Sequence, residues 1–159
     1  MAWDGMMVYT STHPLMAADG RTLQLFYQGQ SCSHHGGYCV DGGKNKNTQP
    51  AVGLATLRPM GWVSMSHSGG GSGSVTTTAL AAVPKLKVNF AARPGGSVEV
   101  TLLDAATGAA ARRSAPLTGD ELEAEVVWHG GAEGAMGAGG VRIEFVLTGD
   151  VELYSYLVG

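Results

Sequence analysis

Hydrophobic and polar residues alternate along much of the second half of the chain. Apolar residues occupy every second position of 85–90, 141–147 and 151–157, and Ser155 is the one weak member of these sets. A period of two with one polar face is typical of antiparallel strands that bury one face and expose the other to water. The pattern therefore predicts antiparallel sheets with a core on one side.

Shorter β-rich runs, separated by Gly, Pro and Asp, extend this pattern along the chain. The predicted strands are 23–28, 52–57, 62–65, 74–80, 85–90, 97–103, 123–128, 141–148 and 151–157. Those from residue 62 onward follow one another at roughly ten-residue intervals, which is typical of a β-sandwich. We therefore expect an all-β fold, with an antiparallel β-sandwich of jelly-roll or immunoglobulin-like type over 61–159.

A glycine-rich segment at 66–74 has the composition of a flexible linker. The strand-like residues 61–65 just before it favour a different interpretation, a glycine-rich hairpin loop inside the sandwich. The second irregular stretch, 31–51, holds a cysteine loop followed by a polar insertion without a core-forming pattern.

Composition and charge exclude some classes of partner. The chain has ten Lys and Arg against thirteen Asp and Glu, a net charge of −3, and no basic cluster beyond Arg112 and Arg113. This balance argues against a nucleic-acid partner. No apolar run approaches the roughly 18 residues that a membrane-spanning helix needs, so no transmembrane segment is expected.

The two cysteines, Cys32 and Cys39, close a short loop that contains glycines. Such a pair, with no third thiol, favours a disulfide and an oxidising compartment, either extracellular or in the lumen of the secretory pathway. The alternative is two unrelated reduced thiols. No signal peptide is visible at the N-terminus.

Several short motifs, taken in order, resemble the end of a longer architecture. Three segments resemble the last blade of five-bladed β-propeller glycosidases and their relatives. They are Leu25–Gly29, His34–Gly36 and Val52–Arg58, the last of which runs into Gly61–Ser64. Later motifs resemble the β-sandwich appended to such propellers. They are 73–77, 86–90, 98–104, 128–131, 141–145 and 153–156.

The resemblance implies a partial propeller-like blade over 1–60 and a β-sandwich module over 61–159. The catalytic carboxylates of such propellers lie mostly in earlier blades, so this chain is expected not to be an enzyme. The resemblance implies instead a non-catalytic accessory module that binds carbohydrate, with Tyr27, His34 and His35 as the best ligand-facing candidates.

Other residues offer weaker signals for the same chemistry. Sugar sites combine aromatic faces with polar neighbours, and Tyr154 and Tyr156 share the predicted polar side of 151–157 with Glu152. That pair could be a binding platform or a covered interface. Asp4 and Asp19 stand beside glycines, where local backbone hydrogen bonds are a more common role than catalysis.

A metal site is a further hypothesis, based on His34 and His35 between Cys32 and Cys39. These side chains supply the nitrogen and sulfur ligands that zinc prefers, but their spacing matches no established zinc motif. We therefore expect no metal and no cofactor.

A second function remains open beside carbohydrate binding. A lone blade leaves unpaired strand edges and exposed apolar residues such as Leu25, Val52 and Leu54. The chain would then be a structural or interaction subunit, whose strands are covered by another protein chain.

Overall fold

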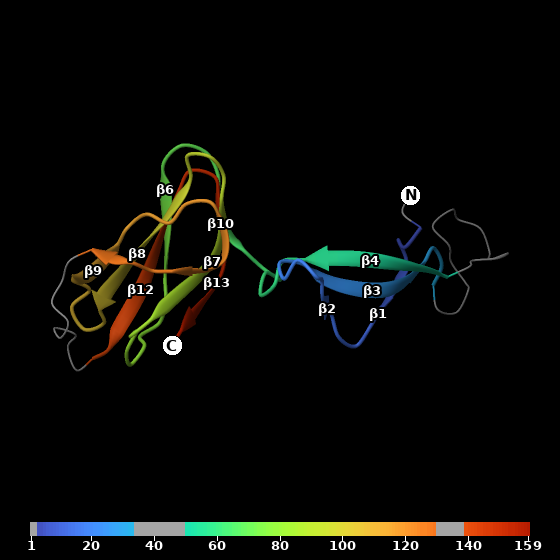
Figure 1. The fold of residues 1–159 in the computed structure, drawn as a ribbon, viewed down its shortest axis with the longest axis horizontal. Coiled ribbons are helices and arrows are strands. Elements are labelled where there is room, and N and C mark those ends of the chain that lie inside the picture. The colour runs from blue at the N-terminus through green and yellow to red at the C-terminus, as the bar shows by residue number, and fades with distance from the viewer. Residues whose placement is uncertain (1–2, 34–49, 130–138) are drawn as a thin grey trace. The chain divides into compact units, whose positions relative to one another are not determined.

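The computed structural model describes residues 3–33, 50–129 and 139–159 (Figure 1). These residues form antiparallel strands and contain no helix, so the predicted all-β class is confirmed. The described ranges accordingly hold no helix of the length and hydropathy that would span a membrane. The chain divides into two compact units, Met1–Pro59 and Met60–Gly159.

The N-terminal unit is built on one sheet with a long central strand. Its strands are β1 (Met7–Thr10), β2 (Leu15–Met16), β3 (Leu23–Gln30) and β4 (Ala51–Leu57). Both β1 and β2 pair with β3 along one edge, and β4 pairs with its other edge. The sequence patterns had predicted β3 and β4 but neither of the short strands.

Asp19 shapes the turn between β2 and β3. Its Oδ1 accepts backbone N–H groups from Arg21 at 2.8 Å and Thr22 at 3.0 Å, and its Oδ2 accepts the Thr22 hydroxyl at 2.7 Å. The hydrogen bond from the Arg21 backbone, followed by that from the Thr22 hydroxyl, lowers the pKa of this carboxyl. Asp19 is therefore a turn residue, the commoner role of an aspartate beside glycine.

The C-terminal unit contains two antiparallel sheets. Its strands are β5 (Met65–His67), β6 (Ser72–Thr76), β7 (Leu86–Ala92), β8 (Ser97–Asp104), β9 (Ala110–Ser114), β10 (Asp120–Glu125), β11 (Trp128–His129), β12 (Val141–Thr148) and β13 (Val151–Val158). One sheet has the order β10-β7-β13-β5, and the other has the order β11-β9-β8-β12-β6.

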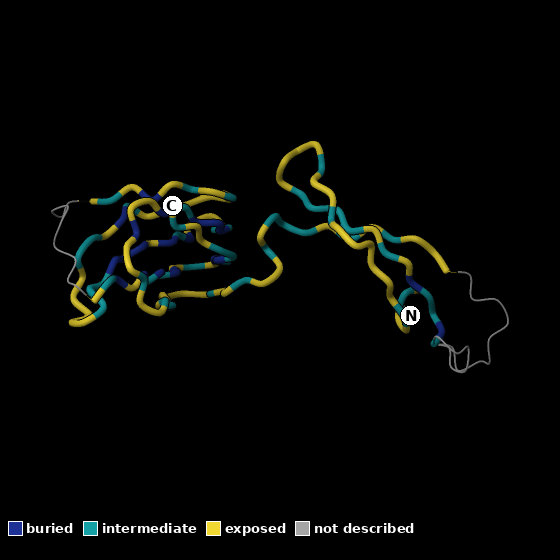
Figure 2. The backbone as a smooth tube through the Cα atoms, turned by 90° about the horizontal axis from the view of Figure 1, so that it is seen from below, coloured by how far each residue is buried: buried dark blue, intermediate teal, exposed yellow. Residues whose placement is uncertain are grey.

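One hydrophobic core joins these two sheets. Alternate residues of β7 and β12, such as Val88, Phe90, Ile143 and Phe145, are at most 1% exposed. They belong to the same cluster as Val98, Val100 and Leu102 of β8, and Figure 2 shows the corresponding dark-blue segments of this unit. The alternation predicted over 85–90 and 141–147 is thus confirmed.

The alternation predicted over 151–157 is wrong beyond Leu153. The pairing of β13 with β7 shifts by one residue between Leu153 and Ser155, which is the mark of a β-bulge. An extra residue reverses which side chains face the core. Leu157 is consequently 59% exposed, whereas Tyr156 contacts the core residue Phe145.

The glycine-rich segment is neither a linker between units nor a hairpin loop. It lies within the C-terminal unit, where β5 pairs with β13 of one sheet and β6 pairs with β12 of the other. Residues 68–71 therefore carry the chain from one sheet to the other. Gly69 and Gly71 have φ values of 99° and 106°, a region that L side chains rarely adopt.

Candidate functional site

Two side chains of the N-terminal unit, those of Trp3 and Asp4, contact Tyr27. The Tyr27 hydroxyl donates a hydrogen bond to Oδ2 of Asp4 at 2.7 Å. The rings of Trp3 and Tyr27 are nearly parallel, with centroids 5.7 Å apart and an interplanar angle of 15°. We call Trp3, Asp4 and Tyr27 the aromatic platform.

Two glycines in the strands make room for the platform. Gly53 lies opposite Tyr27 in the β3–β4 ladder, and a Cβ added to it would overlap the tyrosine ring. A Cβ on Gly29 would come within 2.7 Å of Cζ3 of Trp3 and 2.5 Å of Cβ of Asp4. The absence of side chains at these two positions therefore lets both aromatic rings approach the backbone of the sheet.

The platform combines an accessible aromatic surface with fixed polar atoms. Trp3 is 44% exposed, and Tyr27 is half-buried. The hydrogen bond to Asp4 is the main cause that raises the pKa of Tyr27, followed by partial burial and the charge of Asp4. The phenol is therefore held as a donor, and Asp4 presents a carboxylate beside two rings.

Tyr27 was expected from the sequence to face a ligand, but its two partners were not. Trp3 and Asp4 are more than twenty residues away from Tyr27 along the chain, and no periodicity connects them. Gly29 and Gly53 were the available signal, because an isolated glycine within a strand often marks the close approach of another group.

The remaining candidates of the cysteine loop are only partly described. Cys32 is buried, at 1% exposure. Its predicted disulfide partner Cys39, together with His34 and His35, lies outside the described residues, so the disulfide and the ligand-facing role of both histidines stay predictions. Within 3–33, 50–129 and 139–159, no cluster of three or more His, Cys, Asp or Glu side chains is placed to hold a metal ion.

Tyr154 and Tyr156 do not form a shared polar surface. The Tyr154 hydroxyl donates to Oε2 of Glu152 at 2.7 Å, as their common position on the strand predicted. Tyr156 instead packs against Phe145, with ring centroids 5.4 Å apart, because the bulge in β13 turns it toward the core. The expectation that both tyrosines stand beside Glu152 is therefore wrong for Tyr156.

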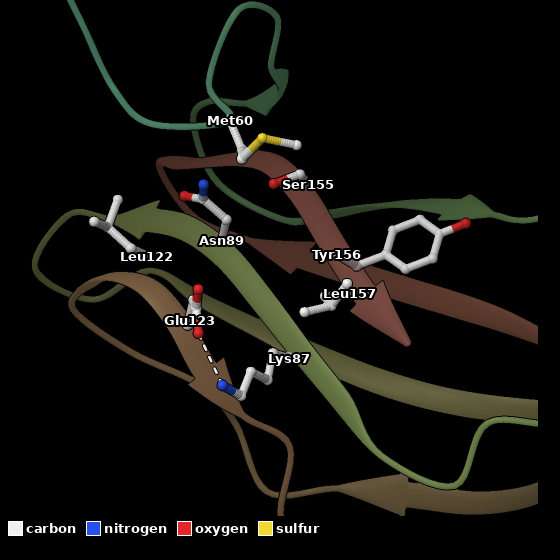
Figure 3. A pocket seen from close by; sticks show the side chains of 8 residues that line it. All are labelled: Met60, Lys87, Asn89, Leu122, Glu123, Ser155, Tyr156 and Leu157. Atoms are coloured by element: carbon white, nitrogen blue, oxygen red, sulfur yellow. Dashed lines mark hydrogen bonds and ion pairs between the residues drawn. The ribbon is translucent and has the colours of Figure 1, made fainter. Parts of the chain in front are cut away.

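A shallow depression lies on the outward surface of β7, β10 and β13, with a volume of about 280 Å³ (Figure 3). Its lining residues are Met60, Lys87, Asn89, Leu122, Glu123, Ser155, Tyr156 and Leu157. Nζ of Lys87 lies 2.8 Å from Oε2 of Glu123, and this hydrogen bond is the main cause that raises the pKa of Lys87. In Figure 3 the Tyr156 ring points away from this ion pair.

The carboxylates described in the N-terminal unit, Asp4 and Asp19, have structural partners. Asp4 accepts the Tyr27 hydroxyl, and Asp19 holds the turn before β3.

Comparison of the chain with protein-family models, with curated proteins and with solved structures finds no match.

Proposed function

We propose that this chain is a non-catalytic accessory module of a glycosidase-like protein and that it binds carbohydrate at the aromatic platform. In this proposal the N-terminal sheet is a partial propeller-like blade, and the C-terminal unit is a β-sandwich of jelly-roll or immunoglobulin-like type. The observation that carries the proposal is the exposed ring of Trp3, held parallel to Tyr27 and next to the Asp4 carboxylate.

The chemistry of the platform suits a sugar ring. An aromatic face packs against the apolar C–H face of a pyranose, and polar groups at its edge accept or donate hydrogen bonds to hydroxyls. Trp3 supplies the accessible face, while the Asp4 carboxylate has acceptor capacity beyond its bond to Tyr27. The existing contacts also restrict the rotation of these side chains, which reduces the entropy cost of binding.

The depression of the C-terminal unit supports carbohydrate binding less well. Its ammonium and carboxylate groups are already paired with each other, and a ligand would have to compete with that contact. The aromatic residue of its lining, Tyr156, packs on Phe145, and its ring points away from the ion pair. We therefore assign the proposed sugar contact to the platform.

The non-catalytic part of the proposal rests on the chemistry of glycoside hydrolysis. That reaction needs two carboxyl groups about 5 to 10 Å apart across the sugar, one of them a proton donor. Asp4 is an acceptor for Tyr27, and the lowered pKa of Asp19 keeps this carboxyl ionised near neutral pH, so that it carries no proton to donate. Incubation of the purified chain with a panel of oligosaccharides should accordingly release no products, and robust turnover would contradict this part of the proposal.

Binding is tested by titrating the isotope-labelled chain with oligosaccharides and following backbone amide shifts by NMR. We expect shifts at Trp3 and along β3, and a loss of affinity of about fivefold or more in Trp3→Ala, since aromatic contacts contribute on the order of 1 kcal/mol or more. Trp62→Ala is the matched control, because Trp62 is also exposed, at 59%, but belongs to the other unit. Absence of binding, or equal losses in the two variants, would refute the assignment.

A further inference from the structure

The carboxylate of Asp4 has no positively charged partner in the described part of the chain. Among the described residues, its side chain makes one hydrogen bond, in which Oδ2 accepts the Tyr27 hydroxyl at 2.7 Å. A phenol is a neutral donor, so it stabilises the carboxylate without cancelling its charge. The aromatic platform therefore carries an uncompensated negative charge.

The Lys and Arg residues described in the N-terminal unit lie at the other end of its sheet. No Asp, Glu, Lys or Arg occurs in β1, β2, β3 or β4. Arg21 and Arg58 lie beside the ladder end at which the first residue of β3 pairs with the last residue of β4. Asp4 lies against Gly29, six residues further along β3, which is about 20 Å in a strand. Charges beyond about 8 Å are largely screened at physiological salt, so these two cations do not neutralise Asp4.

The two aromatic rings add to the attraction for a cation. The face of an aromatic ring is the negative end of its quadrupole, and it attracts a cation within about 6 Å of the ring centroid. Trp3 is stacked on Tyr27, and the Tyr27 hydroxyl is bonded to Asp4, so both kinds of negative group lie together. The same hydrogen bond raises the pKa of Tyr27, so the phenol stays protonated and neutral.

We propose that the carbohydrate ligand of the aromatic platform is an amino sugar, bound in its ammonium form. This inference rests on the proposed function and names the class of sugar that the site takes. The ammonium group would donate to the Asp4 carboxylate, while the C–H face of the same ring packs on Trp3. An acidic sugar would be repelled by this carboxylate, and a neutral sugar would leave its charge uncompensated.

The experiment compares three tetrasaccharides that have the same linkage and differ only at C2 of each ring. They consist of glucosamine, N-acetylglucosamine or glucose, which carry an ammonium, an acetamide or a hydroxyl group there. Each is titrated into the full chain at mildly acidic pH, where amines are protonated and an ordinary aspartate is ionised, and amide shifts are followed by NMR. We expect the glucosamine form to bind about tenfold more tightly than the other two, since an exposed ion pair and a cation–π contact each contribute a few-fold.

Asp4→Asn tests whether the preference comes from this carboxylate. Asparagine keeps an acceptor for the Tyr27 hydroxyl but has no charge. The affinity for the glucosamine form should fall by about fivefold, while the affinities for the two neutral forms change by less than about twofold. Asp19→Asn is the matched control, because it removes the same charge from the same unit but lies in the turn before β3, and it should change none of the three affinities.

The outcomes separate this inference from the proposed function. Equal affinities for the three sugars would overturn the inference and leave carbohydrate binding intact, whereas absence of binding by all three would refute both. A preference for the amine that survives Asp4→Asn would also overturn the inference. So would an equal loss in Asp19→Asn, because the net charge of −3 would then be the cause.

Discussion

The two units of this protein both consist of antiparallel strands, but among the residues that the structure describes only the C-terminal unit has a hydrophobic core. In the described part of the C-terminal unit, fourteen buried hydrophobic residues form a single cluster, and twelve of them lie in strands of the two sheets. In the described part of the N-terminal unit, Cys32 is the only buried hydrophobic residue. The difference follows from geometry, because two sheets can bury their apolar faces against each other, whereas one sheet needs a further layer.

The two units also hold their aromatic side chains in different ways. In the C-terminal unit, Phe90 and Phe145 are held by the packing of both sheets. In the N-terminal unit, Tyr27 is held by Trp3, by a hydrogen bond to Asp4 and by a neighbouring glycine. The second arrangement leaves aromatic surface accessible to a ligand, and for this reason we place the proposed binding site in the N-terminal unit.

Truncating one phenylalanine in each unit should reveal the greatest difference in stability between them. Phe90→Ala should lower the free energy of unfolding by about 3–5 kcal/mol, because it leaves a cavity in the shared core. Phe26→Ala should lower the free energy of unfolding by less than about 1 kcal/mol, since Phe26 is already 42% exposed. Urea denaturation followed by circular dichroism measures both, and similar losses would contradict the contrast between the units.

A second comparison tests the bulge in β13. Leu153→Ala should destabilise the C-terminal unit by about 2–5 kcal/mol, whereas Leu157→Ala should change its stability by less than about 0.5 kcal/mol. Leu153 is 6% exposed and Leu157 is 59% exposed. Simple alternation without the bulge would instead make the two losses comparable, so the same denaturation measurement distinguishes the registers.

Adding a methyl group beneath the platform should have an intermediate effect. Gly53→Ala forces a Cβ into the Tyr27 ring and should cost about 1–3 kcal/mol of local stability, together with the proposed sugar affinity. Gly70→Ala is the control, because nothing lies within 4 Å of a Cβ at that position. Hydrogen exchange of the β3 amides should accelerate in the first variant only, and unchanged exchange would show that the ring is not held against Gly53.

The smallest effects are those of pH on exposed groups, and they have opposite signs in the two units. The pKa of Asp19 is lowered, mainly by the hydrogen bond from the Arg21 backbone. Its ionised carboxylate therefore stabilises the folded turn above the ordinary aspartate pKa, and this stabilisation is lost as pH falls through the lowered value. The pKa of Lys87 is raised, mainly by its hydrogen bond to Glu123. Its protonated amine therefore stabilises the fold below the ordinary lysine pKa, and this stabilisation is lost as pH rises through the raised value.

Hydrogen exchange at several pH values measures these two dependences separately. Asp19→Asn keeps an acceptor in the turn but does not titrate, and it should remove part of the acid sensitivity of β2 and β3. Lys87→Met should remove part of the alkaline sensitivity of β7 and β10. An acid response that persists unchanged in Asp19→Asn would assign it to another carboxylate.

Sequence patterns located most of the strands that have one wet face. The range 141–148 matches β12 residue by residue, and the predicted strand 97–103 ends one residue before β8 does. Prediction was poorer where alternation was weak. The strand predicted at 62–65 begins only at Met65, and β9 was missed because its sequence Ala-Ala-Arg-Arg-Ser has no apolar alternation.

The candidate site was predictable only in part, because its members come together through long-range contacts. Tyr27 was a candidate through the resemblance to propeller glycosidases, but its contact with Trp3 depends on the path of the N-terminal segment over Gly29. Tyr156 was placed on the wrong side because a single extra residue in β13 changes the register of all that follows.

The alternation of hydrophobic and polar residues was enough to assign the all-β class, since a period of two leaves few alternatives to antiparallel strands. Strand pairing was needed to show which glycines admit an aromatic ring and where β13 bulges. Those features depend on pairing between strands that are distant along the chain, and such pairing cannot be predicted from local patterns of residues.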